Sequence, residues 1–113
     1  MADPLYTHGK LGEAVQALAT GLGRINERLR EATGHLAGVD ENVFSVSGVH
    51  LDARAFWRRI QEAITSAKTV DPKRGLNATS IDDMTEEEAS DVAQFIVSLD
   101  AMLGSYLEDR RRD

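Results

Sequence analysis

The chain has 113 residues, the length of one domain, and its 42% hydrophobic and 28% charged residues are typical of a globular protein. The net charge of −6 provides no overall basic field, so direct binding to nucleic acid or to an anionic membrane surface is not expected. The chain has no cysteine, which excludes disulfides and thiolate metal sites and is compatible with a cytoplasmic location. Neither an export signal nor a bilayer-spanning segment is expected from the sequence.

The clearest pattern lies in residues 11–36, where apolar residues recur at alternating spacings of four and three. The series is Leu11, Val15, Leu18, Leu22, Ile25, Leu29, Ala32 and Leu36. This heptad-like repeat places one apolar seam along a long helix, predicted over about 10–37. Small residues beside the seam favour a packed bundle, and the glycines at 21–23 allow a kink. The open length of the seam predicts self-association into a homodimer, and the residues assigned to that contact are Leu18, Leu22, Ile25 and Leu29.

Residues 43–51 (VFSVSGVHL) follow the glycines that end this first helix. Their apolar residues alternate around Ser47-Gly48, which predicts a small β-hairpin with a two-residue turn. An isolated hairpin is only marginally stable, so an ordered loop that covers one end of the bundle is an equal alternative.

A second helix is expected over about 53–70, with Asp52 as its N-cap. Trp57 falls at the edge of the apolar stripe of this helix. The residues beside it on the outer face are Arg54, Arg58 and Gln61. Because tryptophan and arginine often carry the binding energy of protein interfaces, this group is a candidate partner-binding patch. In the alternative interpretation, Trp57 closes the core and an arginine stem covers its ring.

A third helix is expected over about 85–111, because Thr85 and Glu88 have the spacing of a capping box. Acidic side chains in a first helical turn are favoured by the helix dipole, by about 0.3–1 kcal/mol each. The acidic run from 82 to 91 is therefore mainly a helix start, and part of it is assigned to a surface that faces a partner. The residues of that acidic surface are Asp82, Asp83, Glu86, Glu87 and Asp91.

No pattern in the chain indicates catalysis. The histidines His8, His35 and His50 do not share a helix at metal-ligand spacing, and no phosphate-binding glycine loop or nucleophile motif occurs. We therefore expect a protein that is not an enzyme, with no catalytic residue, no metal and no cofactor.

These patterns together predict an all-α fold, a three-helix bundle with a long first helix. The predicted function is a non-enzymatic protein-binding module that inhibits or regulates a partner protein. Small acidic helical proteins of this type include immunity proteins, antitoxins and phage anti-CRISPR proteins, and the acidic surface would compete for a basic nucleic-acid-binding groove. The first alternative is a self-assembling structural subunit. The second is a small nucleic-acid-binding regulator that uses Arg54, Arg58, Arg59, Lys73 and Arg74.

Overall fold

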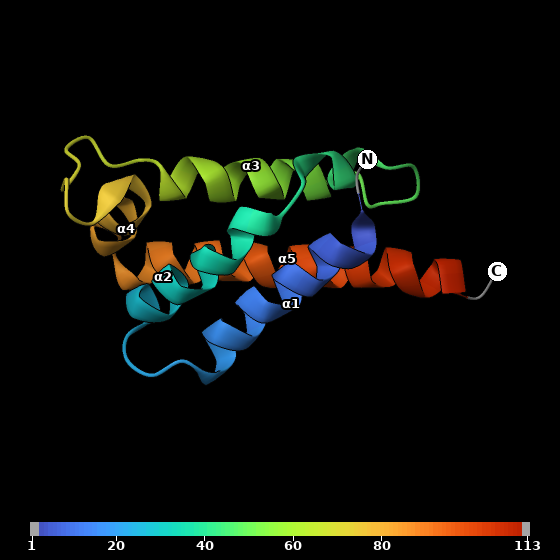
Figure 1. Ribbon diagram of the computed structural model, residues 1–113, viewed down its shortest axis with the longest axis horizontal. Coiled ribbons are helices and arrows are strands. Elements are labelled where there is room, and N and C mark those ends of the chain that lie inside the picture. Colours follow the sequence, from blue (N-terminus) through green and yellow to red (C-terminus); the bar gives the residue numbers. More distant parts are fainter. Residues whose placement is uncertain (1–2, 112–113) are drawn as a thin grey trace.

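The computed structural model describes residues 3–111, which fold into five α-helices and two short 3-10 helices (Figure 1). The α-helices are α1 (Pro4–Thr20), α2 (Ile25–His35), α3 (Ala53–Ile64), α4 (Gly75–Asp82) and α5 (Glu86–Arg111), and the 3-10 helices are η1 (Leu36–Gly38) and η2 (Glu41–Ser45). No strand occurs within residues 3–111. The all-α prediction is confirmed, whereas the predicted count of three helices is wrong.

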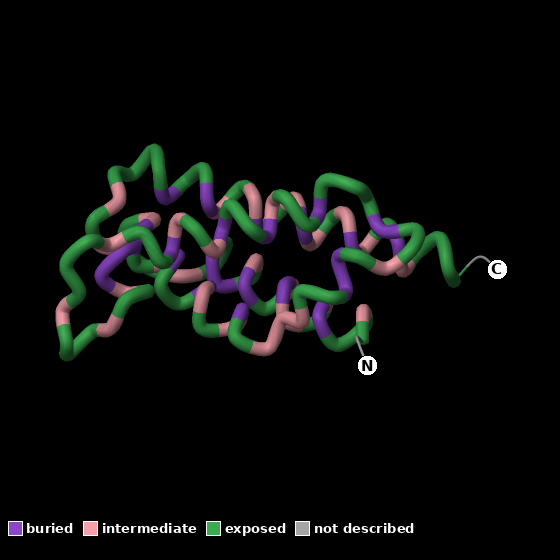
Figure 2. Tube along the Cα trace, turned by 90° about the horizontal axis from the view of Figure 1, so that it is seen from above, coloured by how far each residue is buried: buried purple, intermediate pink, exposed green. Residues whose placement is uncertain are grey.

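Helix α5 is the central element of the fold. It packs against α1, α2 and α3, and Figure 1 shows it running the length of the molecule between α3 and the α1–α2 pair. Its predicted apolar seam is confirmed, because all six of its members are buried: Ala89, Val92, Ile96, Leu99, Leu103 and Tyr106. Figure 2 shows the buried positions concentrated where the helices face one another, with exposed positions along the outer turns.

The predicted long first helix is instead two helices that fold back on each other. Helix α1 ends at Thr20, and α2 begins at Ile25. Gly23 in the connecting turn has a φ of 95°, a conformation that favours glycine. The Arg28 Nη1 group donates a hydrogen bond of 3.0 Å to the Leu18 carbonyl oxygen near the end of α1. This contact satisfies a carbonyl that the helix end leaves without a backbone partner.

The predicted β-hairpin over 43–51 is not formed. The segment begins in η2, where the Asp40 carboxylate accepts a hydrogen bond of 2.9 Å from the Asn42 backbone N–H. Val43 and Phe44 are buried in the core, and residues 46–52 continue as turns. The ordered loop, the equal alternative, describes the segment correctly, because Val43, Phe44 and Val49 enter the bundle instead of pairing across a ladder, while Leu51 at its end is exposed.

Helix α4 occupies a segment that the sequence assigned to a connector, and α3 ends at Ile64 instead of near residue 70. Ile81 is fully buried, and the two polar residues before it are buried as well. The Ser80 hydroxyl accepts a hydrogen bond of 2.9 Å from the Ala67 N–H, and the Thr79 hydroxyl accepts one of 3.2 Å from the Asp71 N–H. Helix α4 thus fixes the loop after α3 through side-chain hydroxyls, which a pattern of apolar residues does not reveal.

Candidate partner-binding surfaces

The residues predicted as a patch on α3 divide between the core and the surface. Trp57 is 6% exposed, and its ring lies 5.6 Å from that of Phe44, centroid to centroid. This arrangement matches the alternative in which Trp57 closes the core. Gln61 is half-buried, while Arg54 and Arg58 are exposed. The indole ring is therefore buried, whereas the side chains of Arg54 and Arg58 are exposed to solvent.

An exposed leucine that the sequence analysis did not select lies beside these arginines. Leu51 is 94% exposed and precedes Arg54 by three residues. The turn that carries it is held at the start of α3, where the His50 Nδ1 atom accepts a hydrogen bond of 3.1 Å from the Asp52 backbone N–H. The Asp52 side chain, predicted as the cap, makes no capping hydrogen bond. The alternating pattern in 43–51 had suggested that Leu51 belongs to a β-strand, so its exposure was not predicted.

Arg54 and Arg58 share one carboxylate. The Nε atom of each lies 3.8 Å from Glu41 Oε1, and all three side chains are about half exposed. Ion pairs this exposed contribute little to stability, typically about 0–1 kcal/mol. Two guanidinium groups thus lie against one carboxylate of Glu41, and the exposed Asp52 carboxylate stands next to Leu51 in the chain. We call Leu51, Arg54 and Arg58 the α3 face.

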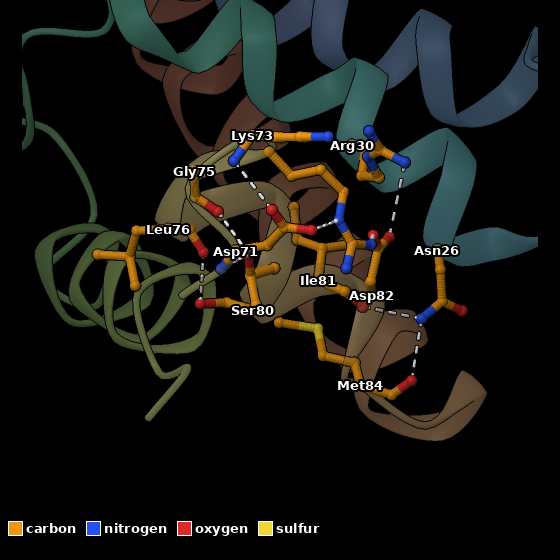
Figure 3. Close-up of polar contacts among 12 residues, drawn as sticks. Asn26, Arg30, Asp71, Lys73, Gly75, Leu76, Ser80, Ile81, Asp82 and Met84 are labelled. Atoms are coloured by element: carbon orange, nitrogen blue, oxygen red, sulfur yellow. Dashed lines mark hydrogen bonds and ion pairs between the residues drawn. The ribbon is translucent and has the colours of Figure 1, made fainter. Parts of the chain in front are cut away.

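The predicted acidic surface is partly occupied by arginines of the same chain. Asp82 pairs with Arg74 and with Arg30, whose Nη1 atom lies 3.7 Å from Asp82 Oδ1 (Figure 3). Glu86 pairs with Arg24 at 3.5 Å, Oε1 to Nε. Of the five predicted residues, Asp83, Glu87 and Asp91 are exposed and have no ion pair within the described part of the chain. Three of the five predicted residues therefore remain free to meet a partner.

The close-up in Figure 3 shows that the pairs of Asp82 belong to a structural cluster that joins α2 to α4. The buried Asn26 side chain donates hydrogen bonds of 2.9 Å to the carbonyl oxygens of Ile81 and Met84. The Lys73 backbone N–H and then the Arg74 guanidinium lower the pKa of Asp71 by donating hydrogen bonds to its carboxylate. These ion pairs and hydrogen bonds tie Asp82 into the contact between α2 and α4, which explains it as a structural residue, although the buried Asn26 Oδ1 atom has no hydrogen-bond partner in the described part of the chain.

The five basic residues of the nucleic-acid alternative do not form a single group of free cations. Arg54 and Arg58 face Glu41, and the Arg59 guanidinium lies over the Phe95 ring at 5.6 Å from the centroid. Lys73 and Arg74 belong to the loop before α4, where Arg74 is held between Asp71 and Asp82. Each arginine of this set thus has a partner within the chain.

Each histidine pairs with one carboxylate, and the three pairs are separate from one another. They are His8 with Asp100 at 3.3 Å, His35 with Glu13 at 3.1 Å and His50 with Asp52 at 3.9 Å. Among residues 3–111, no group of three or more histidine, aspartate and glutamate side chains is arranged to hold a metal ion.

The four residues assigned to self-association have different environments. Leu18 and Leu29 are buried within the chain, Ile25 is partly buried, and Leu22 is 92% exposed. Leu18 and Ile25 line a groove of about 550 Å³ between the α1–α2 pair and α5. The rest of its lining is Val15, Ala19, Ala93, Gln94, Val97 and Ser98. The seam therefore forms mostly intramolecular core and leaves one apolar groove at the surface.

Comparisons of the chain with protein-family models, curated proteins and solved structures gave no match. Within the described residues, no helix has both the length and the apolar character needed to cross a membrane.

Proposed function

We propose that the protein is a non-enzymatic binding module that inhibits or regulates a partner protein by occupying it through the α3 face. The observation that carries this proposal is the exposed Leu51 beside two exposed arginines at the start of one helix. Arginine is enriched among residues that dominate interface energies. A leucine that enters a partner's apolar pocket contributes roughly 1.5–3 kcal/mol.

The two guanidinium groups of the α3 face favour a partner surface that carries carboxylates beside an apolar pocket. Arg54 and Arg58 lie one helical turn apart and have only Glu41 between them. Guanidinium groups can grip carboxylates through two parallel hydrogen bonds, which sets orientation as well as affinity. We place this action in the cytoplasm, because a chain without cysteine suits a reducing compartment.

A second candidate surface is the acidic one, now reduced to Asp83, Glu87 and Asp91. Glu87 and Asp91 lie one turn apart at the start of α5, and all three carboxylates are exposed. Such a surface suits a basic, nucleic-acid-handling protein whose groove it would occupy in place of phosphates. Binding of that kind would weaken steeply with added salt.

The test is a tagged pull-down from a lysate of the cells that produce the protein, with nuclease added and mass-spectrometric readout. We expect one dominant partner with the wild-type chain and its loss with the double variant Leu51→Asp, Arg58→Glu. Leu5→Asp is the matched control, since Leu5 is also an exposed leucine, 71% exposed, at the start of a different helix. Retention of the partner by the double variant would contradict the proposal that the α3 face binds the partner. Loss with Glu87→Lys, Asp91→Lys instead would assign binding to the acidic surface.

A further inference from the structure

Helix α5 has an exposed strip without charge. Its members are Ser90, Gln94, Val97, Ala101 and Ser105, spaced four, three, four and four residues apart, and all five are exposed. This spacing keeps them on one side of the helix over about four turns. In a chain with 28% charged residues, five solvent-facing positions would ordinarily include about one or two charges. We call these five residues the neutral strip.

The apolar groove adjoins this strip. Gln94 and Val97 belong to both, and Val15, Leu18 and Ala19 of α1 with Ile25 of α2 form the opposite side of the groove. Val97 is 47% exposed although it is a large apolar side chain. The neutral strip and the groove thus form one continuous face.

Leu22 is an exposed leucine close in the chain to the groove. It is 92% exposed, in the turn between α1 and α2, and the groove residues Leu18 and Ile25 precede and follow it. The hydrogen bond from Arg28 to the Leu18 carbonyl oxygen holds this turn against α1. The turn at one end of the groove therefore carries a leucine that the chain itself does not cover.

We propose that this face binds a second copy of the chain, in a two-fold dimer in which Leu22 of each copy enters the groove of the other. A two-fold contact requires a self-complementary surface, and an uncovered leucine at one end of an apolar groove provides one. The neutral strip favours the same occupant, because its five positions bring no charged side chain of one net-negative chain against the other, and the exposed Glu87 and Asp91 lie only at its Ser90 end. The α3 face takes no part in this contact.

The first test is the mass of the protein in solution, measured by sedimentation or light scattering from micromolar to millimolar concentration. We expect a dimer for the wild-type chain and a shift to the monomer mass for Leu22→Asp and for Val97→Glu. Leu51→Asp is the matched control, because Leu51 is 94% exposed but lies on the α3 face, and it should remain dimeric. A wild-type chain that is monomeric over the whole range overturns the proposal, as does a Leu22→Asp variant that remains dimeric.

The second test locates the contact by disulfide cross-linking. The chain has no cysteine of its own, so only the introduced cysteines can form a disulfide. A mixture of Leu22→Cys and Val97→Cys chains should form a mixed disulfide dimer on mild oxidation. A mixture of Leu22→Cys with Ala55→Cys, an exposed position on α3, should not. Equal yields from the two mixtures, or no disulfide between positions 22 and 97, would overturn the arrangement.

Discussion

Two carboxylates have pKa values that the fold moves in opposite directions. The Lys10 ammonium group, 3.3 Å from Glu13 Oε2, lowers the pKa of Glu13, and His35 adds to this effect. Burial raises the pKa of Asp100, and the nearby His8 opposes that change. Glu13 therefore stabilises the fold above its ordinary pKa, and this contribution is lost as the pH falls through its lowered value. Ionised Asp100 destabilises the fold, and this penalty disappears as the pH falls below its ordinary pKa.

We accordingly predict opposite effects for two charge-removing substitutions. At neutral pH, Glu13→Gln should lower the free energy of unfolding and Asp100→Asn should raise it, both relative to the wild-type chain. At a pH below the lowered pKa of Glu13, which is also below the pKa of Asp100, both differences should vanish, because both wild-type side chains are then protonated. Urea unfolding of the wild-type chain and both variants at the two pH values measures these differences in the free energy of unfolding. Shifts of the same sign at neutral pH would show that the environment assigned to one of the two groups is wrong.

At the residue scale, the sequence predicts those side-chain contacts that form between residues close together in the chain. The capping box is confirmed in both directions, with Glu88 N–H donating to Thr85 Oγ1 at 3.1 Å and Thr85 N–H donating to Glu88 Oε1 at 3.2 Å. The burial of Trp57 involves residues outside its own helix, among them Phe44 of η2, whose ring lies against it. A helical wheel places Trp57 at the edge of a stripe and cannot include that contact.

At the element scale, the turn between α1 and α2 decides the fold of the first third of the chain. Gly23→Ala should lower the free energy of unfolding by about 1–2 kcal/mol, because an L-residue is strained at its φ of 95°. Gly34→Ala is the control with the opposite sign. Gly34 lies inside α2, and a Cβ there would meet nothing within 4 Å, so the helix should gain about 0.5–1 kcal/mol. Chemical denaturation of both variants is the measurement, and equal shifts would argue against a turn at Gly23.

The apolar repeat over 11–36 could not by itself distinguish one long helix from two antiparallel ones. Leu11 and Leu29 are fully buried as the repeat predicts, but they face a core that the two halves build together. The glycines at 21–23, which the sequence marks only as a kink, determine the reversal. Helix α4 was missed for a related reason, because Thr79 and Ser80 are buried through hydrogen bonds and not through apolar character.

At the scale of the whole molecule, α5 contributes to the core, to the dimer contact and to the acidic surface, and the last two adjoin at Ser90. Its buried side supports the core, its neutral strip belongs to the dimer contact, and its first turns carry the acidic surface. The α3 face lies outside all three. A two-fold dimer would therefore present two copies of the α3 face, and a partner with repeated sites would bind both with increased effective concentration.

Hydrogen exchange along the chain, with and without the captured partner, tests whether the α3 face meets that partner. We expect slower exchange in residues 46–58, which include the Leu51 turn and the first turns of α3, with residues 83–91 unchanged. Protection confined to residues 83–91 would contradict it and assign the partner to the acidic surface. Protection confined to the neutral strip and the groove would contradict both this claim and the dimer, because the partner would then occupy the face assigned to a second copy.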